Sequence, residues 1–392
     1  IEYKQLSDKS IYYNKFLNAL SKTYNTKINK FITDKNNWLN YYTDYKDILC
    51  NEIEYEYEKN EMWIFNSNAW KCFINYIKNR DIHKTLIISL SGGVDSMVFL
   101  YLCILYRIEK PLFKFTAIHI NWNQRTESEK EANFLIEYLK NNEIPYLYKN
   151  INHLKRSNNR ELFEKEGKKI RFAIYQEAIE KWNGDSIFLG HHKGDIVENV
   201  FTNMIYSKNI TNLGKMKEKM EINNSDIVLV RPFLRINKSD IYEVAKKNLI
   251  PFFKNTTPEW SNRGAIREKI FPQIENHFGK RYEDGFMNMA KKSEELGILI
   301  NDYLINPYLE KIIKINENTF SFPYITKYPF VFYEIVFEKF MYSKDKQKIK
   351  TKALKSWYEI IKRNKEWKSF TFNPKCKIYV KDENTLFLEI NM

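Results

Sequence analysis

Glycine and proline are scarce in this chain, at 11 and 10 of 392 residues, and no low-complexity linker or internal repeat interrupts it. A repeat protein is therefore excluded. The four cysteines form no Cys-x-x-Cys pair, so the sequence offers no zinc or iron–sulfur site of that kind. No apolar run approaches the length of a transmembrane helix, and we expect no membrane partner.

Two further absences bear on where the protein works. No signal-peptide pattern opens the chain, and its cysteines are scattered singly, which fits a reducing compartment. Residue 1 is Ile rather than Met, which leaves open a targeting segment removed upstream. We therefore expect a cytoplasmic protein, or one of an organelle matrix.

Basic residues exceed acidic ones, with 63 Lys and Arg against 49 Asp and Glu and a net charge of +14. Such a surplus favours a polyanionic partner, because neutralising phosphates releases counterions. A generally basic protein without such a partner is the alternative. The length suggests two or three domains, and the sequence leaves a homodimer open.

The apolar pattern changes near residue 81. Residues 1–80 have helical spacing and are predicted to form a helical N-terminal extension. Residues 81–280 alternate between strands and helices, which predicts an α/β fold with a doubly wound, mostly parallel sheet. The predicted strands are 86–91, 113–121, 145–151, 186–192 and 227–234, and the predicted helices are 95–108, 128–142, 167–182, 195–206 and 238–248.

Residues 281–392 are predicted to form a helical connector and a small α+β domain. A long helix is expected at 282–304 and a shorter one at 351–364, followed by a hairpin that turns at 382–384. The region is basic, and we favour RNA binding over a purely structural role for it.

The motif Ser91-Gly92-Gly93-Val94-Asp95-Ser96 lies between the first predicted strand and the following helix. A strand, a glycine-rich turn and a helix present backbone N–H groups to a phosphate. The two glycines let the backbone approach an anion, and Asp95 is a candidate Mg²⁺ ligand. The motif lacks the Gly-Lys-Ser/Thr ending of a Walker A loop and the third glycine of a dinucleotide fingerprint.

Polar motifs also follow the other predicted strands, where ligands of such sheets bind. His119, Asn121 and Arg125 follow the second strand, although a lone histidine is more often structural. After the fourth strand, Asp195 and Glu198 share one face in the first turn of a helix. They are candidates to bind Mg²⁺ or to orient an attacking amine, and N-capping is the alternative.

Cationic side chains complete the set of candidates. Lys168 and Arg171 share a helix face, which is either a phosphate-contacting face or a solvated one. Arg231 ends the fifth strand. Arg263 and Arg267 stand at the start of a helix, where cations oppose the dipole, so phosphate binding is the natural reason for them.

These motifs, in this order, resemble the tRNA(Ile)-lysidine synthase family of the PP-loop N-type ATP pyrophosphatases. The resemblance covers roughly residues 84–305, with a weaker echo in the C-terminal region. It implies the PP-loop ATP pyrophosphatase fold, the substrates ATP and tRNA, Mg²⁺, and free lysine as co-substrate. In that chemistry O2 of an anticodon cytidine attacks the α-phosphorus of ATP, and lysine then displaces AMP from C2.

The resemblance also implies roles for residues of this chain. Asp95, Asp195, Glu198 and Arg263 would be catalytic, with Asp95 also assisting the metal. The ATP-binding residues would be Ser91, Gly92, Gly93, Val94, Asp95, Ser96, His119, Asn121 and His191. The residues that contact tRNA or phosphate would be Arg125, Lys168, Arg171, Arg231 and Arg267.

The chain departs from the family pattern at three places. Gly194 stands where the family usually has an acid, residues 122–125 replace the usual His-x-Leu-Arg, and residues 257–261 differ from the usual Asp-x-Ser-Asn run. Three rivals therefore remain: a tRNA 2-thiolation enzyme, disfavoured by the scattered cysteines; a small-molecule amide-forming enzyme, disfavoured by the charge; and an inactive PP-loop protein that only binds tRNA.

Overall fold

The structure is a computed structural model. The residues that it describes are 45, 47–49, 63–78, 80–81, 83–154, 160–208, 210–222, 225, 227–248, 250–253, 261–323, 328–363, 367–382 and 385–390. Most of the predicted N-terminal extension and residues 254–260 lie outside this set. The chain divides into two compact units: the first contains the described residues up to Ile205 and Gly214–Met287, and the second contains Tyr206–Leu213 and Asn288 onward.

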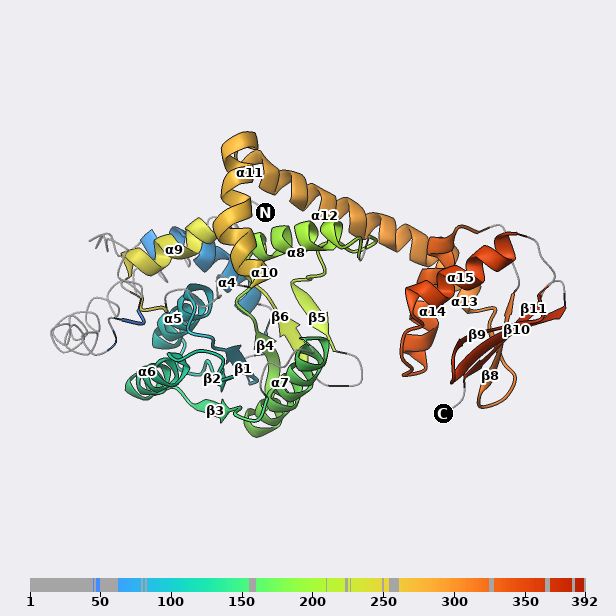
Figure 1. Ribbon diagram of the computed structural model, residues 1–392. Helices are drawn as coiled ribbons and strands as arrows, with labels where there is room; N and C mark the ends of the chain where they lie inside the picture. The colour runs from blue at the N-terminus through green and yellow to red at the C-terminus, as the bar shows by residue number, and fades with distance from the viewer. Residues whose placement is uncertain are drawn as a thin grey trace, which may run out of the picture. The chain divides into compact units, whose positions relative to one another are not determined.

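The first unit is built on a six-stranded sheet with the order β3-β2-β1-β4-β6-β5 (Figure 1). Its strands are β1 (Thr85–Ser89), β2 (Phe115–Asn121), β3 (Tyr146–Asn150), β4 (Gly184–Phe188), β5 (Lys219–Glu221) and β6 (Val228–Val230). All neighbours pair in parallel except β5 with β6. The order reverses between β1 and β4, so these two adjacent strands form the switch point where such sheets bind ligands.

Helices cover both faces of this sheet, because alternate residues of a strand point to opposite sides. Leu86 and Ile88 of β1 pack with one cluster of apolar residues, and Ile87 between them packs with another. The helices of the unit are α3 (Trp63–Asn66), α4 (Asn68–Ile77), α5 (Val94–Glu109), α6 (Ser128–Asn141), α7 (Arg160–Trp182), α8 (Lys193–Ile205), α9 (Lys238–Lys247), α10 (Asn262–Ala265), the π-helix η1 (Ile266–Ile270) and α11 (Phe271–Phe278). The predicted doubly wound fold is confirmed.

The second unit holds a five-stranded antiparallel sheet with the order β7-β8-β11-β10-β9. Its strands are β7 (Ile313–Lys314), β8 (Thr319–Pro323), β9 (Ser369–Asn373), β10 (Cys376–Asp382) and β11 (Thr385–Ile390). The helices α14 (Phe330–Ser343) and α15 (Thr351–Lys362) share one apolar core with this sheet. The predicted hairpin is β10–β11, and the small C-terminal α+β fold is confirmed.

One long helical stretch links the sequences of the two units. It consists of α12 (Arg281–Ile300), the π-helix η2 (Asn301–Ile305) and α13 (Asn306–Leu309), close to the predicted helix 282–304. Within the second unit, Ser293 donates to the carbonyl of Ile210 and accepts from the N–H of Leu213. No helix among the described residues is long and apolar enough to cross a bilayer.

Three predicted boundaries are corrected by the structure. The fourth predicted strand, 186–192, is β4, which ends at Phe188. Helix α7 begins at Arg160 rather than at residue 167, and the fifth predicted strand shrinks to β6. Strands β5, β7 and β8 were not predicted at all.

Candidate active site

The glycine turn after β1 is held by its own hydroxyls. Ser96 Oγ donates to the Gly93 carbonyl at 2.9 Å, and the Gly93 N–H donates to Ser91 Oγ at 3.3 Å. His119, at the end of β2, bonds the carbonyl of Leu90 through Nδ1 at 2.9 Å. His119 therefore fixes the backbone just before the turn, and burial lowers its pKa, so the ring is neutral.

Gly92 tolerates no side chain, for two independent reasons. Its φ of +79° is in the left-handed region, and a Cβ there would overlap the ring of Phe253. The Phe253 N–H also donates to the Gly92 carbonyl at 2.9 Å. The turn is thus clamped by a chain segment about 160 positions away in the sequence, a contact that no local pattern predicts.

Replacing Gly92 by alanine should destabilise the protein by at least about 2 kcal/mol, from the left-handed backbone and the overlap with Phe253. The matched control is Gly285→Ala in α12, where no described atom lies within 4 Å of a new Cβ. That change should stabilise by about 0.5–1 kcal/mol through helix propensity. Urea unfolding of both variants checks this, and equal stability of the two would contradict the clamp.

The loop after β4 touches the glycine turn. A Cβ at Gly190 would lie 3.0 Å from Cβ of Asp95 and 3.2 Å from the N atom of Ser96, so a side chain at this position would crowd the glycine turn. The loop leads into α8, whose first turn carries Asp195 and Glu198. The structure therefore brings Asp95 and the acidic pair together at the switch point between β1 and β4, as predicted.

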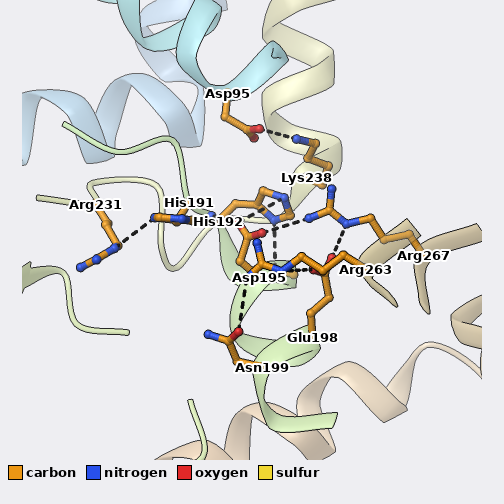
Figure 2. Close-up of polar contacts among 11 residues, drawn as sticks. Asp95, His191, His192, Asp195, Glu198, Asn199, Arg231, Lys238, Arg263 and Arg267 are labelled. Atoms are coloured by element: carbon orange, nitrogen blue, oxygen red, sulfur yellow. Dashed lines mark hydrogen bonds and ion pairs between the residues drawn. The ribbon is translucent and has the colours of Figure 1, made fainter. Parts of the chain in front are cut away.

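Arg267 joins the two carboxylates of α8 (Figure 2). Its Nη2 donates to Asp195 Oδ1 at 3.0 Å and its Nε donates to Glu198 Oε1. Arg263 Nε lies 3.7 Å from Glu198 Oε2, and its Nη2 donates to Asn199 Oδ1 at 3.4 Å. Two buried acids and two partly exposed arginines thus form one charge cluster.

The two acids of this cluster are tuned in opposite directions. Burial raises the pKa of Glu198, whose Oε2 is buried without a hydrogen-bond partner among the described residues. Burial alone would also raise the pKa of Asp195. The ring of His192, the backbone N–H of His192 and Arg267 together outweigh burial, so the pKa of this carboxyl is lowered. Glu198 is therefore the better proton acceptor of the pair, because the stronger base is the acid with the higher pKa.

His191 and His192 lie just before α8 and bond different groups of the site. His191 Nδ1 accepts from Nε of the buried Arg231 at 3.1 Å. His192 Nδ1 accepts from the N–H of Gly194 at 3.0 Å, and the His192 N–H donates to Asp195 Oδ2 at 2.9 Å. Burial lowers the pKa of both rings, that of His191 to about 4, so His191 is neutral at pH 7.

Gly194 is explained by the ring of His192. A Cβ at position 194 would lie 2.7 Å from Cε1 of that ring, so any side chain there would push the ring away. The space next to Gly194 is therefore filled by the ring of His192.

The low pKa of His191 makes stability depend on pH. At pH 5 the histidine of the unfolded chain, whose pKa is about 6.5, binds a proton. His191 in the folded protein, whose pKa is about 4, stays neutral at the same pH. The free energy of unfolding should therefore fall by about 2 kcal/mol through His191 alone between pH 8 and pH 5. Urea titrations should show that His191→Gln removes this part of the fall. The exposed His83, changed to Gln, is the control and should leave the pH dependence as in the wild type.

The sequence model of the PP-loop domain family matches residues 66–274, which is more than half of the chain. This chain belongs to the PP-loop family. The match spans the sheet, the glycine turn and the acidic pair, and it implies that this PP-loop protein binds ATP.

Curated relatives of the PP-loop protein carry a more specific name. The tRNA(Ile)-lysidine synthase of Chlamydia caviae is 30% identical over 62% of this chain and 74% of its own length, and that of Chlamydia pneumoniae is 29% identical over 60% and 69%. The tRNA(Ile)-lysidine synthase of Protochlamydia amoebophila is 28% identical over 59% and 49%. The predicted relationship to this family is confirmed.

Two solved structures are also similar to parts of the chain. The U34-tRNA thiolase NcsA from Methanococcus maripaludis has a TM-score of 0.46 and 14% identity, covering 61% of this chain and 81% of its own. The NH3-dependent NAD synthetase from Campylobacter jejuni has a TM-score of 0.34 and 14% identity, covering 64% and 97%.

The predicted nucleic-acid contacts of the PP-loop protein lie at several places. Arg267 belongs to the charge cluster, where it bonds the two acids. Arg231 lies beside the cluster and bonds His191. Arg125 pairs with Glu131 at 2.5 Å, and the exposed Arg171 lies over the ring of Trp122 at 5.5 Å. Their roles toward RNA stay predictions.

A groove of about 890 Å³ lies beside α7, next to the β5–β6 hairpin. Its lining includes Lys165, Lys168, Lys169 and Phe172. The lysines are exposed. Lys168 is therefore placed on an open basic surface, which suits a polyanion.

Lys238 is the residue of this site that the sequence reasoning missed. Its Nζ lies 2.5 Å from Asp95 Oδ2, while Asp95 Oδ1 is buried and has no hydrogen-bond partner among the described residues (Figure 2). The only signal was a lysine at the first position of a helix, where the dipole disfavours it.

The carboxylate of Asp95 is a suitable ligand for a Mg²⁺ ion. The orphaned Oδ1 is a hard carboxylate oxygen, which Mg²⁺ prefers. Among the described residues no group of three or more His, Cys, Asp and Glu could hold a metal ion. A metal here would thus be held by Asp95 and by phosphate oxygens, as is usual for Mg²⁺ that arrives with a nucleotide.

Proposed function

We propose that this PP-loop protein attaches lysine to C2 of a cytidine in a tRNA anticodon, with cleavage of ATP to AMP and pyrophosphate. The observation that carries the proposal is the close approach of Gly190 to the glycine turn, because Gly190 lies in the loop that leads into the acidic pair of α8. A phosphate-binding turn and a basic carboxylate, Glu198, meet at one point, which is what a two-step adenylylation and amine transfer needs.

In the first step, backbone N–H groups of residues 92–96 at the start of α5 hold the polyphosphate. The O2 atom of cytidine forms a bond to the α-phosphorus, the bond to the bridging oxygen breaks, and pyrophosphate leaves with the electron pair. Asp95 would hold the Mg²⁺, whose chemistry is to screen the charge of the phosphates.

In the second step, the ε-amine of lysine forms a bond to C2, and AMP leaves with the electron pair of the C2–O bond. The amine loses a proton, and Glu198 is the group with the raised pKa to accept it. Arg267 holds both carboxylates in place, and Arg263 on the same cluster is the cation nearest to solvent for the phosphate of the adenylate.

The relatives named tRNA(Ile)-lysidine synthase support lysine as the nucleophile. The thiolation alternative is disfavoured by the cysteines. Cys103 is fully buried among apolar side chains, burial raises its pKa, and Cys72 and Cys376 are also separate and free.

One assay separates the candidates. The protein is incubated with labelled ATP, bulk tRNA and labelled lysine, and AMP, pyrophosphate and lysine on the RNA are followed. Lysine on tRNA, dependent on ATP, is the expected result. Pyrophosphate release that requires sulfide would establish the thiolation enzyme instead, and tRNA binding without ATP turnover would establish an inactive binder.

A further inference from the structure

Lys238 carries its charge at a position that disfavours it. It is the first residue of α9, directly after the N-cap Asn237, and the helix dipole repels a cation there. An opposing attraction must hold it, and the ion pair with Asp95 at 2.5 Å supplies that attraction. The pair is therefore a specific feature of the site and not an incidental surface contact.

The position of the ammonium is next to the phosphate-binding turn. Asp95 is the second residue of α5, whose N-cap is Gly93, so Lys238 Nζ lies beside the N-terminus proposed to hold the polyphosphate. The backbone before Lys238 is fixed too, since the Ile236 carbonyl accepts from the N–H of Lys193 at the start of α8. The lysine side chain is 30% exposed, so an arriving anion has access to it.

Lys238 and a metal would compete for the same carboxylate. Asp95 has one oxygen on Lys238 and one buried oxygen without a partner among the described residues. A cation that comes with ATP draws the carboxylate toward itself and weakens its hold on the ammonium. An ammonium beside the N-terminus of α5 is then placed to contact a polyphosphate bound there.

We propose that Lys238 is a pyrophosphate-binding residue, which neutralises Asp95 until the nucleotide arrives and then contacts its β- and γ-phosphates. This rests on the proposed function only in that ATP is cleaved between its α- and β-phosphates. As the bond from the α-phosphorus to the bridging oxygen breaks, the electron pair stays on pyrophosphate, and the ammonium of Lys238 neutralises the new charge.

The test uses the full chain without tRNA or lysine. Lys238→Met removes the charge, Lys238→Arg keeps it, and Lys246→Met in the last turn of α9 is the matched control. Electron paramagnetic resonance measures the affinity for Mn²⁺ alone, and calorimetry measures the affinity for inorganic pyrophosphate with Mg²⁺. Lys238→Met should bind Mn²⁺ several-fold more tightly, because Asp95 is released, and pyrophosphate about tenfold more weakly.

Opposite shifts in the affinities for Mn²⁺ and for pyrophosphate distinguish the proposal from damage to the fold, because damage would lower both affinities together. Lys238→Arg and Lys246→Met should keep both affinities within about twofold. Unchanged pyrophosphate affinity in Lys238→Met, or a joint loss of both affinities, would overturn the proposal. A protein that shows the expected shifts but attaches no lysine to RNA would overturn the proposed function alone.

Discussion

Replacing Asp95 by asparagine is expected to reduce pyrophosphate release by at least about a thousandfold, because a charge that acts on the transition state is lost while the shape is kept. Two observations support so large an effect. The carboxylate directly follows the glycine turn, and one of its oxygens is buried without a partner among the described residues. Release of labelled pyrophosphate from ATP in the presence of tRNA measures it.

The same variant should bind tRNA within about twofold of the wild type, since Asp95 contacts no part of the predicted RNA surface. The control is Asp81→Asn, an exposed acid before β1, which should change neither quantity. Equal losses of tRNA affinity and of pyrophosphate release in Asp95→Asn would show that the residue maintains the fold rather than the chemistry.

Replacing Glu198 by glutamine is expected to separate the two steps of the reaction. The amide still accepts from Arg267, so the cluster keeps its geometry, but it takes no proton from an amine. Lysine transfer should fall by about 10²–10⁴-fold while pyrophosphate release continues, and adenylylated tRNA should accumulate. Rapid quenching with labelled ATP and labelled lysine, followed by analysis of the RNA, measures both steps.

The pH dependence of lysine transfer and a control variant test this prediction further. Because burial raises the pKa of Glu198 and its charged form is needed, lysine transfer should be lost as the pH falls through that raised pKa. The exposed Glu268, next to Arg267 in the chain, provides the control as Glu268→Gln, which should leave both steps as in the wild type. Loss of pyrophosphate release in Glu198→Gln would place this acid in the first step instead.

Local signals were enough for much of the fold. The apolar patterns of β1 to β4, which have five to seven residues, and of the helices α5, α6, α8 and α9 predicted these elements to within a few residues. Strands β7 and β8 had no such signal. β7 has two residues, and β8 ends in Pro323 and gains its stability by pairing with β11, more than 60 positions later. Pairing partners so distant in the chain are set by the tertiary fold.

The site divides in the same way. Topology alone placed the motifs after β1 and β4 side by side, because neighbouring parallel strands end at one edge of the sheet. The pairing of Arg267 with both acids, the clamp of Phe253 on the glycine turn and the bond of Lys238 to Asp95 were not foreseen. Each joins residues that are distant in sequence, and in each the residue types alone fit several partners.

The close approach at Gly190 joins two segments of the site, the glycine turn and the loop before α8. Gly190 lets the loop that leads to the two acids lie against the glycine turn, since a Cβ there would be 3.0 Å from Cβ of Asp95. A larger residue at position 190 would push on Asp95 and on the backbone N atom of Ser96 at the same time. Gly190 is therefore a position at which a single substitution would disturb the phosphate-binding turn and the loop before the acidic pair together.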